Sequence, residues 1–440
     1  MPASQSREMG HGLRAQVRRS RHAHWSPAPR RRDPVEILRG QEAGRIASLL
    51  PTRHERMAVS EFTFFRGAAA IMAEDLAHTP ACGLRVQACG DAHLANFGIY
   101  ATPERRVVFD VNDFDETLPA PFEWDVKRLA TSLVVAGRDR GFAAADCQSA
   151  ARAGVAAYRT RMRAAAQMGH LDVWYARIDA DELVALSARA AERELSLSVV
   201  RKAHHATNLG ELDKLTTVVD GRRRIIDSPP LVEHLPEPGA RLDAAAVIGE
   251  YAASLGDATR TLLGRYALVD WARKAVGVGS VGTDDAVALL LGDSDSDPLF
   301  LQVKEATASV LEPFAGASPY DNHGRRVVAG QRLIQSASDV FLGWTRLGER
   351  DYYVRQLRDM KGAVPTDKLS APELADYGRA CGEGLALGHA RSGDPAAIAG
   401  YLGSGDRFDR AIATFADAYA DQNAADYARF LATLEPVKSS

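Results

Sequence analysis

GDAHLANFG, at residues 90–98, is a polar loop that lies between two segments with the character of β-strands. Before it, Leu84–Cys89 alternates apolar and polar residues, as a strand with one buried face does. After it, Phe97–Ala101 and Arg105–Asp110 are separated by a Thr-Pro-Glu turn and predict a β-hairpin. Polar side chains on a loop held between strands are good candidates for a site, because a rigid scaffold fixes their positions.

Within this loop, Asp91 and Asn96 stand five residues apart, which is the arrangement of a kinase catalytic loop. The carboxylate of Asp91 would accept or orient the proton of an attacking hydroxyl group, and the amide of Asn96 would hold a metal ion on nucleotide phosphates. A loop of this length lets both side chains face one cavity, with Gly90 and Gly98 relaxing the backbone at its ends. His93 is a supporting residue of the same site.

VFDVNDFDE, at residues 108–116, brings a dense group of carboxylates to the end of an apolar strand. Such a concentration of negative charge is costly unless cations or water neutralise it, so the pattern predicts a metal site. Asp110 ends the strand as the metal-binding Asp of a kinase does, and Asp113 is the alternative because it opens an Asp-Phe pair. Asp115 is a supporting carboxylate. The run lacks the glycine and the distal glutamate of a calcium loop.

GVGSVG, at residues 277–282, matches the pattern G-x-G-x-x-G. A dinucleotide-binding fingerprint opens a helix, whereas this loop leads into the predicted strand Ala286–Leu291, as the glycine loop of a kinase does. Its candidate phosphate-binding residues are Gly277, Gly279, Ser280 and Gly282. One hairpin later, Lys304 follows the apolar strand Leu299–Val303, where its ammonium group would neutralise nucleotide phosphates.

Each of these four patterns also has an ordinary structural explanation. A polar loop with an Asp and an Asn is usually a turn, and carboxylates after a strand often cap a helix or face water. Glycine motifs occur by chance, and a lysine at the end of a strand commonly faces solvent. The prediction of a nucleotide and metal site therefore depends on all four patterns occurring together, each in its expected local context.

The rest of the chain predicts an α+β fold with a mostly helical large lobe and a small antiparallel β-rich lobe. Alanine-, arginine- and leucine-rich segments over 122–204 and 371–430 have helical periodicity, whereas 271–357 is rich in strands around a helix at Arg325–Ser336. The expected division is a disordered basic tail over 1–32, a helical lobe with the catalytic and metal loops over 33–240, a β-rich nucleotide-binding lobe over 241–362, and helices over 363–440 that complete the helical lobe.

The overall composition is that of an ordinary globular protein. The 440 residues are 46% hydrophobic and 25% charged, and no run of about 18 apolar residues predicts a membrane span. The formal net charge of −3 argues against a nucleic-acid polycation. The four cysteines form no C-x-x-C pair, so they predict free thiols in a reducing cytoplasm and no zinc site.

Residues 1–32 differ from this average because they hold eight arginines against one acidic residue. Their composition predicts a disordered basic tail, and an arm that binds nucleic acid or a membrane surface is the alternative. No apolar segment with the length of a signal peptide follows these charges.

The chain is similar to the bacterial DUF2252 family, which is grouped with the protein-kinase-like superfamily. The matching segments are Phe62–Gly67 (FTFFRG), Gly90–Gly98, Val108–Glu116, Pro121–Ser132 (PFEWDVKRLATS), Lys274–Thr283 (KAVGVGSVGT), Phe300–Ala306 (FLQVKEA), Arg326–Gln335 (RVVAGQRLIQ) and Asp339–Trp344 (DVFLGW). The match extends over about residues 33–430. In addition, Gly90–His93 resembles the G-D-x-H loop of aminoglycoside and choline kinases.

This resemblance implies roles for particular residues. Asp91 would be the catalytic base, Asn96 and Asp110 would be metal ligands, and Asp125 in the following helix would brace the catalytic loop. Arg326–Gln335 would be the helix behind the lysine, and it lacks the glutamate that pairs with this lysine in kinases. Gln331, Gln335 and Glu312 are the candidate substitutes. Tyr352–Met360 would be the last strand of the small lobe and the hinge that faces adenine.

The order of the motifs departs from that of a standard kinase. The glycine loop and lysine follow Asp91 in this sequence instead of preceding it, so a single site requires a circularly permuted order of lobes. Two segments compete for the helix that precedes the catalytic loop. Sequence order favours Glu61–Asp75, and a strict permutation favours Tyr377–Ala390.

Together these patterns predict an ATP- and Mg²⁺-dependent phosphotransferase whose acceptor is the hydroxyl group of a small molecule. One alternative is transfer of AMP on the same fold, which adds about 329 Da to the product where phosphate adds about 80 Da. A second is a non-catalytic nucleotide-binding protein, which the missing glutamate favours. A third is a metal-dependent hydrolase built on Asp91, His93, Asp110 and Asp113, for which Gly279 and Lys304 would be irrelevant.

Overall fold

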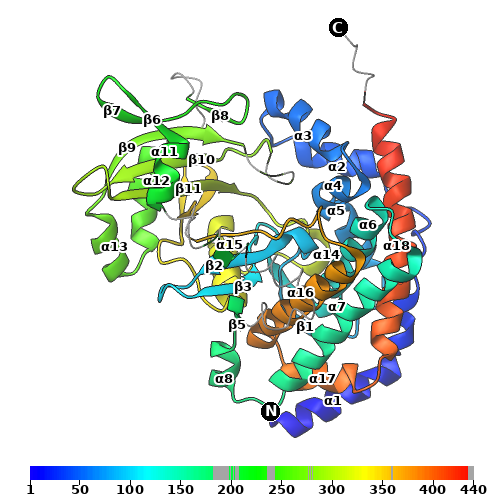
Figure 1. The fold of residues 1–440 in the computed structure, drawn as a ribbon. Coiled ribbons are helices and arrows are strands. Elements are labelled where there is room, and N and C mark those ends of the chain that lie inside the picture. Colours follow the sequence, from blue (N-terminus) through cyan, green and yellow to red (C-terminus); the bar gives the residue numbers. More distant parts are fainter. Residues whose placement is uncertain are drawn as a thin grey trace.

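The structure, a computed structural model, describes residues 1–181, 198, 200, 201, 203, 208–234, 243–275, 277, 279, 281–357 and 360–434. It has the predicted α+β fold, in which a sheet-rich part stands beside a helical part (Figure 1). The hairpin formed by β2 (Phe97–Ala101) and β3 (Val107–Val111) lies between these two parts and carries the loops of interest at its ends.

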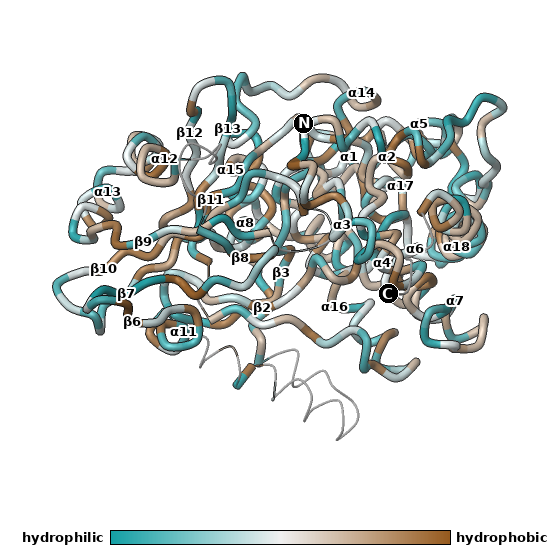
Figure 2. The backbone as a smooth tube through the Cα atoms, turned by 90° about the horizontal axis from the view of Figure 1, so that it is seen from above, coloured by the Kyte–Doolittle hydropathy of each residue, from teal (hydrophilic) through white to brown (hydrophobic). Residues whose placement is uncertain are grey.

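The sheet-rich part is organised around six strands in the order β12-β13-β11-β10-β9-β8, with every neighbouring pair antiparallel. The strands are β8 (Val232–Glu233), β9 (Ala267–Lys274), β10 (Ala286–Leu291), β11 (Pro298–Ala306), β12 (Gly343–Leu347) and β13 (Arg350–Gln356). Figure 2 shows apolar stretches along β9 and β10. The strand predictions around 286–291 and 299–303 are confirmed.

Both faces of this sheet are covered. Alternate residues of β10 point to opposite sides, so this strand contributes side chains to both packed faces. Leu290 and its neighbours on one face pack with α12 (Ala244–Tyr251), near α13 (Asp257–Leu263). On the other face Leu289 packs with side chains from α11 (Asn208–Leu215) and from the hairpin of β6 (Thr216–Val219) and β7 (Arg222–Ile225). The sheet-rich part therefore includes 208–234, ahead of the boundary expected at 241.

The helical part is built from long helices that pack closely. They are α6 (Phe122–Asp139), α7 (Ala144–Ala165), α16 (Ala371–Ser392), α17 (Pro395–Leu402) and α18 (Arg407–Leu431), with α8 (His170–Tyr175) at one end. Glycines permit the approach of α7 and α16: a Cβ atom on Gly382 would lie 2.1 Å from the carbonyl oxygen of Gly154. The helices predicted at 371–390 and 409–430 are confirmed.

Several shorter elements connect the two parts. The strands β1 (Arg85–Ala88) and β4 (Leu118–Pro121) pair with each other, and the short β5 (Ile178–Asp179) extends the β2–β3 hairpin. The helix α15 (His323–Ile334), preceded by α14 (Glu312–Ala315), contacts both the six-stranded sheet and α16. The helix predicted at 325–336 is thus present and lies at the junction.

The segment from 34 to 77 runs from the helical part to the edge of the sheet. It consists of α2 (Pro34–Glu42), α3 (Leu50–Met57), α4 (Glu61–Gly67) and α5 (Ala69–Ala77). At one end its apolar residues pack with Phe430 of α18, and at the other Leu49 packs with Ala275 and Val281 beside the glycine loop. The segment therefore links both parts of the molecule.

Residues 1–32 are folded, so the prediction of a disordered tail is wrong. The helix α1 (Ala3–Gln16) packs on α17, where a Cβ atom on Gly10 would lie 1.9 Å from the carbonyl oxygen of Ala397. Residues 19–23 pack on α18, and Arg31 forms ion pairs with Asp75 and Asp426. The partners of these arginines are distant in the sequence, and a local charge pattern does not reveal them.

Two further predictions concern cysteines and the membrane. All four cysteines are free and buried, as their spacing indicated. Among the helices of the described residues, none combines the length and the apolar character that crossing a bilayer requires.

Candidate functional site

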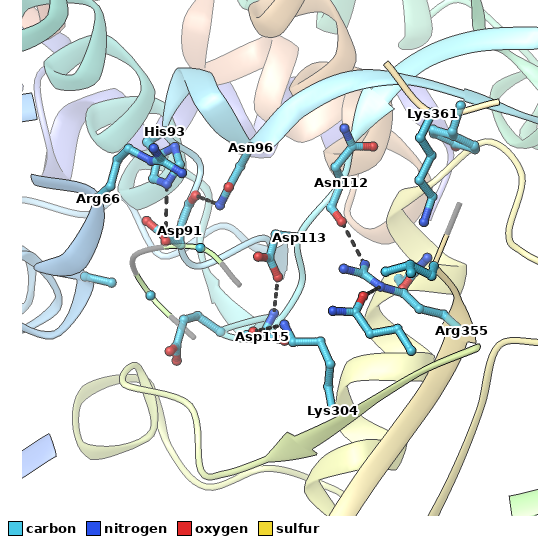
Figure 3. A pocket seen from close by; sticks show the side chains of 18 of the residues that line it. Arg66, Asp91, His93, Asn96, Asn112, Asp113, Asp115, Lys304, Arg355 and Lys361 are labelled. Carbon is cyan, nitrogen blue, oxygen red and sulfur yellow. Dashed lines mark hydrogen bonds and ion pairs between the residues drawn. The ribbon is translucent and has the colours of Figure 1, made fainter. Parts of the chain in front are cut away.

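A cavity of ≈ 390 Å³ lies where the sheet, the predicted catalytic loop at residues 90–98 and the segment 34–77 meet. Of the sequence-predicted residues, Asp91, His93, Asn96, Asp113, Asp115, Gly277, Gly279 and Lys304 line it (Figure 3). Residues separated by about half of the chain thus surround one space. The two halves of the predicted site meet in the structure.

Asp91 is held by a buried arginine from α6. Arg128 donates from Nε to Oδ1 of Asp91 over 2.5 Å, and it also donates to the carbonyl oxygen of Phe65. The amide nitrogen of Asn96 donates to the carbonyl oxygen of Asp91, and His93 Nε2 lies 3.6 Å from Asp91 Oδ2. Burial raises the pKa of Asp91 although Arg128 opposes the shift. The carboxylate is therefore fixed in direction and made more basic.

Asp125 holds the backbone at the start of this loop, as the resemblance implied. Its two carboxylate oxygens accept hydrogen bonds from the backbone N–H groups of Cys89 (2.6 Å) and Gly90 (3.0 Å). His389 Nε2 lies 3.1 Å from Asp125 Oδ2, and Tyr158 contacts the other ring nitrogen of His389 over 2.9 Å. This buried chain fixes the start of the catalytic loop.

Both segments proposed for the preceding helix contact the catalytic loop. Tyr377 of α16 donates to the carbonyl oxygens of Leu94 and Phe97 over 3.1 and 3.0 Å. The earlier segment begins with α4 and continues into α5. Phe62 of α4 lies edge-on to His93 with 6.4 Å between the ring centroids, and Arg66 of α4 lines the cavity. The later segment thus packs against the loop, while the earlier segment borders the cavity.

The structure separates the two alternatives for the metal-binding carboxylate. Asp110 is not among the described residues that line the cavity, because its carboxylate turns toward α15 and accepts from the backbone N–H of Ser336 over 2.9 Å. Asp113 lines the cavity, and burial together with the charge of Asp115 raises its pKa. Of the two carboxylates, Asp113 is therefore the one at the cavity, where a metal ligand was expected.

Lys304 has a different partner from those expected. Its Nζ lies 2.6 Å from Oδ2 of Asp115, and Tyr353 donates to the other carboxylate oxygen over 2.6 Å. Burial lowers the pKa of Lys304, but the charges of Asp115, Tyr353, Asp113 and Asp285 together outweigh this effect and hold it well above its usual range. Lys304 therefore remains an ammonium group in a buried setting.

Gln331 and Gln335 line the cavity, yet their side chains and that of Glu312 bond to groups other than Lys304. Gln331 donates to Gln335, which donates to the carbonyl oxygen of Val111, and Glu312 accepts from the N–H of Ser309. The acidic loop, residues 112–117, is instead held by Arg326 of α15, which donates to the carbonyl oxygens of Asp115 and Thr117. Arg326 also donates to the carbonyl oxygen of Thr307. The prediction of a glutamine or Glu312 as the partner of Lys304 is wrong.

The glycine loop is held against the segment 34–77. Arg56 donates to the carbonyl oxygen of Gly277 over 3.0 Å, and Ile46 donates from its backbone to that of Gly282 over 2.7 Å. Gly277 and Gly282 have φ of 82° and 96°, the left-handed region that favours glycine. Ser280, a predicted site residue, lies outside the described residues.

Several cationic residues of the cavity were missed from the sequence. They are Arg45, Arg53, Arg66, Lys274, Arg355 and Lys361. Arg355 donates to the carbonyl oxygen of Asn112 and to the side chain of Gln302. Three of them stand in segments that the sequence had singled out: Arg66 in FTFFRG at residues 62–67, Lys274 at the start of KAVGVGSVGT at residues 274–283, and Arg355 in Tyr352–Met360.

The chain leaves the sheet along one wall of the cavity. Gln356 at the end of β13 and Leu357 after it line this wall, and Gly362 exchanges two backbone hydrogen bonds of 2.9 Å with Ile99 of β2. This passage from the sheet to the β2–β3 hairpin is the segment expected to form the hinge.

The donors available for a metal ion are few. The described residues contain no group of three or more His, Cys, Asp and Glu side chains arranged to hold one. Asn96 and Asp113 supply one amide oxygen and one buried carboxylate, which fits Mg²⁺, because this ion usually takes one or two protein carboxylates and completes its shell with phosphates and water.

Comparison with known proteins gives a family. The family model described as "Uncharacterized protein conserved in bacteria (DUF2252)" matches residues 45–433 of the chain. No curated protein matches the chain. No solved structure matches it either.

Proposed function

Because the chain belongs to the DUF2252 family, whose description names no activity, we propose its function from the cavity itself. The proposed activity is that of an ATP- and Mg²⁺-dependent phosphotransferase of kinase-like fold with permuted motif order, acting on the hydroxyl group of a small molecule. The observation that carries this proposal is the 2.6 Å contact between Lys304 Nζ and Asp115 Oδ2, which joins the sheet to the acidic loop.

In this proposal the nucleotide occupies the side of the cavity formed by the sheet. Lys304 is a buried cation, and the backbone of Gly277 and Gly279 borders the same space, so both would contact phosphates. Gln356 and Leu357 line the wall where the chain leaves β13, and they would face the base. An anionic phosphate would also compete with Asp115 for the ammonium group, which links nucleotide binding to the acidic loop.

Asn96 and Asp113 would hold Mg²⁺. The ion would neutralise charge on the phosphates during transfer. Burial and the charge of Asp115 raise the pKa of Asp113, and a bound cation would offset both effects. Asp115 remains bound to Lys304 and Tyr353 and would act as a support.

Asp91 would act on the acceptor. The acceptor oxygen bonds to the γ-phosphorus as the bond from that phosphorus to the β–γ bridging oxygen breaks, so ADP leaves. The hydroxyl proton passes to Asp91, whose pKa is raised by burial. The Asp91 side chain is 19% exposed inside the cavity, which favours a small acceptor over the surface of a protein.

The product formed from ATP tests this proposal without a known acceptor, because water replaces the hydroxyl group slowly in such sites. We expect the purified protein to release ADP and phosphate in a reaction that requires Mg²⁺. Lys304→Met is expected to abolish it, and Lys368→Ala, which changes an exposed lysine outside the cavity, is expected to keep it.

Release of AMP and pyrophosphate would instead favour transfer of AMP. ATP hydrolysis that survives in Lys304→Met would contradict the assignment of the phosphates to the sheet side of the cavity.

A further inference from the structure

Three arginines from the segment 34–77 line the cavity without a role in the proposed reaction. They are Arg45, Arg53 of α3 and Arg66 of α4. Side chains that carry like charges and share a buried space repel each other, so their presence needs a compensating anion. The contacts of each arginine show how much of this negative charge the protein's own carboxylates provide.

Arg53 is the most deeply buried of the three, with 1% of its surface exposed. Its Nη2 donates to the carbonyl oxygen of Gly67 over 3.1 Å, while Nε and Nη1 have no hydrogen-bond partner among the described residues. The nearest carboxylate, Glu42, lies 3.6 Å from Nη1 and is already bound to His54. Burial, reinforced by the charge of Arg45, lowers the pKa of Arg53 to about 9.

The other two arginines show the same incomplete pairing. Within the described part of the chain, the buried Nε atoms of Arg45 and Arg66 have no hydrogen-bond partner. Arg45 donates from Nη1 to the carbonyl oxygen of Val281, and burial lowers its pKa although Glu116, Asp285, Glu42 and Asp115 oppose this. Burial also lowers the pKa of Arg66, against the charges of Asp91 and Asp113.

The position of Arg66 indicates which reactant this cluster would serve. Figure 3 shows Arg66 beside His93, across Asp91 from Lys304 and Arg355. Arg53 lies next to it through the hydrogen bond to Gly67. Arg53 and Arg66 therefore lie on the side of Asp91 away from Lys304, which the proposed function assigns to the acceptor, whereas Arg45 reaches the glycine loop at Val281.

We propose that Arg53 and Arg66, with Arg45 at their edge, bind an oxyanion group of the acceptor, so that the molecule phosphorylated at its hydroxyl also carries a phosphate or carboxylate group. Guanidinium groups match both anions because their planar N–H donors bind two oxygens at once. This inference rests on the proposed function, because that function defines which side of Asp91 receives the acceptor.

Anion-induced thermal stabilisation tests it, since a ligand that binds only the native state raises the melting temperature. The probes are inorganic phosphate and acetate at matched ionic strength, each added with and without a saturating non-hydrolysable ATP analogue and Mg²⁺. We expect at least one probe to raise the melting temperature in both conditions. A response to phosphate alone would identify a phosphate ester as the acceptor, and a response to acetate alone a carboxylate.

Two variants and one control locate the anion. Arg53→Met and Arg66→Met lie on different helices and are each expected to lose the shift, whereas Arg39→Met removes an exposed arginine of α2 and is expected to keep it. Arg53→Met without ligand is expected to melt no lower than the wild type, because it removes a buried charge that lacks full pairing. If Arg53 only stabilised the fold, Arg53→Met would instead melt at a lower temperature than the wild type.

Three outcomes would overturn this inference. They are the absence of a shift with both probes, a shift that persists in both variants, and a shift that disappears once the ATP analogue is bound. The last result would assign the arginines to the terminal phosphate of the nucleotide. Stabilisation by the analogue itself is measured in the same series, so loss of nucleotide binding is seen separately from loss of anion binding.

Discussion

Asp91 combines a raised pKa with a fixed direction, and these two properties come from different neighbours. Burial raises its pKa, and the bond from Arg128 fixes the carboxylate. We therefore expect Asp91→Asn to lower the rate of ADP release about 10²- to 10⁴-fold, the usual contribution of a general base. Binding of ATP and Mg²⁺, measured by calorimetry, is expected to change little.

Asp110→Asn is the matched control for this prediction. Asp110 is a buried aspartate at the end of an apolar run, but its two oxygens accept from the backbone N–H groups of Val111 and Ser336, and an asparagine oxygen can keep one of these bonds. A loss of rate in Asp110→Asn equal to that in Asp91→Asn would contradict the placement of the two residues.

At the scale of residues, the sequence predicted Asp91, Asn96 and Lys304 at the cavity because each stands in a local pattern with a chemical reason. It did not separate Asp110 from Asp113, because the choice depends on where α15 ends in space. Gly98 gives a second example. Its role is to make room for the carbonyl oxygen of Gly362, which a Cβ atom would approach to 2.7 Å, and no local pattern shows that contact.

Among the elements, the N-terminal helices depend on a buried ion pair. Arg31 contacts Asp75 and Asp426, whose side chains are 3% and 5% exposed. Arg31→Met would leave two buried carboxylates without their cation, so we expect it to lower the free energy of unfolding by about 3–5 kcal/mol. Urea denaturation measures this change.

Arg30→Met serves as the control because Arg30 is exposed and precedes the same contact. It is expected to change the free energy of unfolding by less than about 0.5 kcal/mol. Equal stability of both variants would show that residues 1–32 behave as the unfolded tail that their composition suggested.

The strand β10 begins beside a buried carboxylate that titrates unusually. Burial, opposed by the charge of Lys304, raises the pKa of Asp285 from 3.8 to about 7. A raised pKa in the folded state means that the group's contribution to stability is present below pH 3.8 and is lost as the pH rises through 7. Asp285→Asn does not titrate. The variant should therefore gain stability relative to the wild type between pH 5 and pH 8, by about 2–3 kcal/mol.

Thermal melting across this pH range checks the prediction. Asp293→Asn changes an exposed aspartate in the turn after β10, and its difference from the wild type is expected to stay constant with pH. A difference for Asp285→Asn that is also constant, or that shrinks toward pH 8, would contradict the buried state of this carboxylate.

At the scale of elements, helices and strands with strong periodicity were predictable, including β10, β11, α15 and α18. The 1–32 segment was not, because its stability comes from arginines that bind carbonyl and carboxylate groups at the other end of the chain. The Asp220-Gly221 turn between β6 and β7 is a local pattern typical of hairpins, yet the docking of this hairpin on β10 through Ile225 and Leu289 has no such local signal.

For the whole molecule, the sequence predicted an α+β fold with two kinds of lobe but left open whether distant motifs share a site. The structure joins them through Lys304, Arg326 and the acidic loop. These contacts link positions about 190–210 residues apart, which no periodicity or local motif contains. The kinase-like chemistry of the shared cavity remains a proposal that binding experiments can test.

Calorimetric titration of ATP, with Mg²⁺ and with a chelator, into the wild type, Lys304→Met, Asp113→Asn and the double variant tests this claim most directly. We predict weaker binding in Lys304→Met under both conditions, weaker binding in Asp113→Asn only with Mg²⁺, and a combined loss with Mg²⁺ that differs from the sum of the two. Wild-type affinity in either single variant with Mg²⁺ would contradict a single nucleotide and metal site built from both halves of the chain.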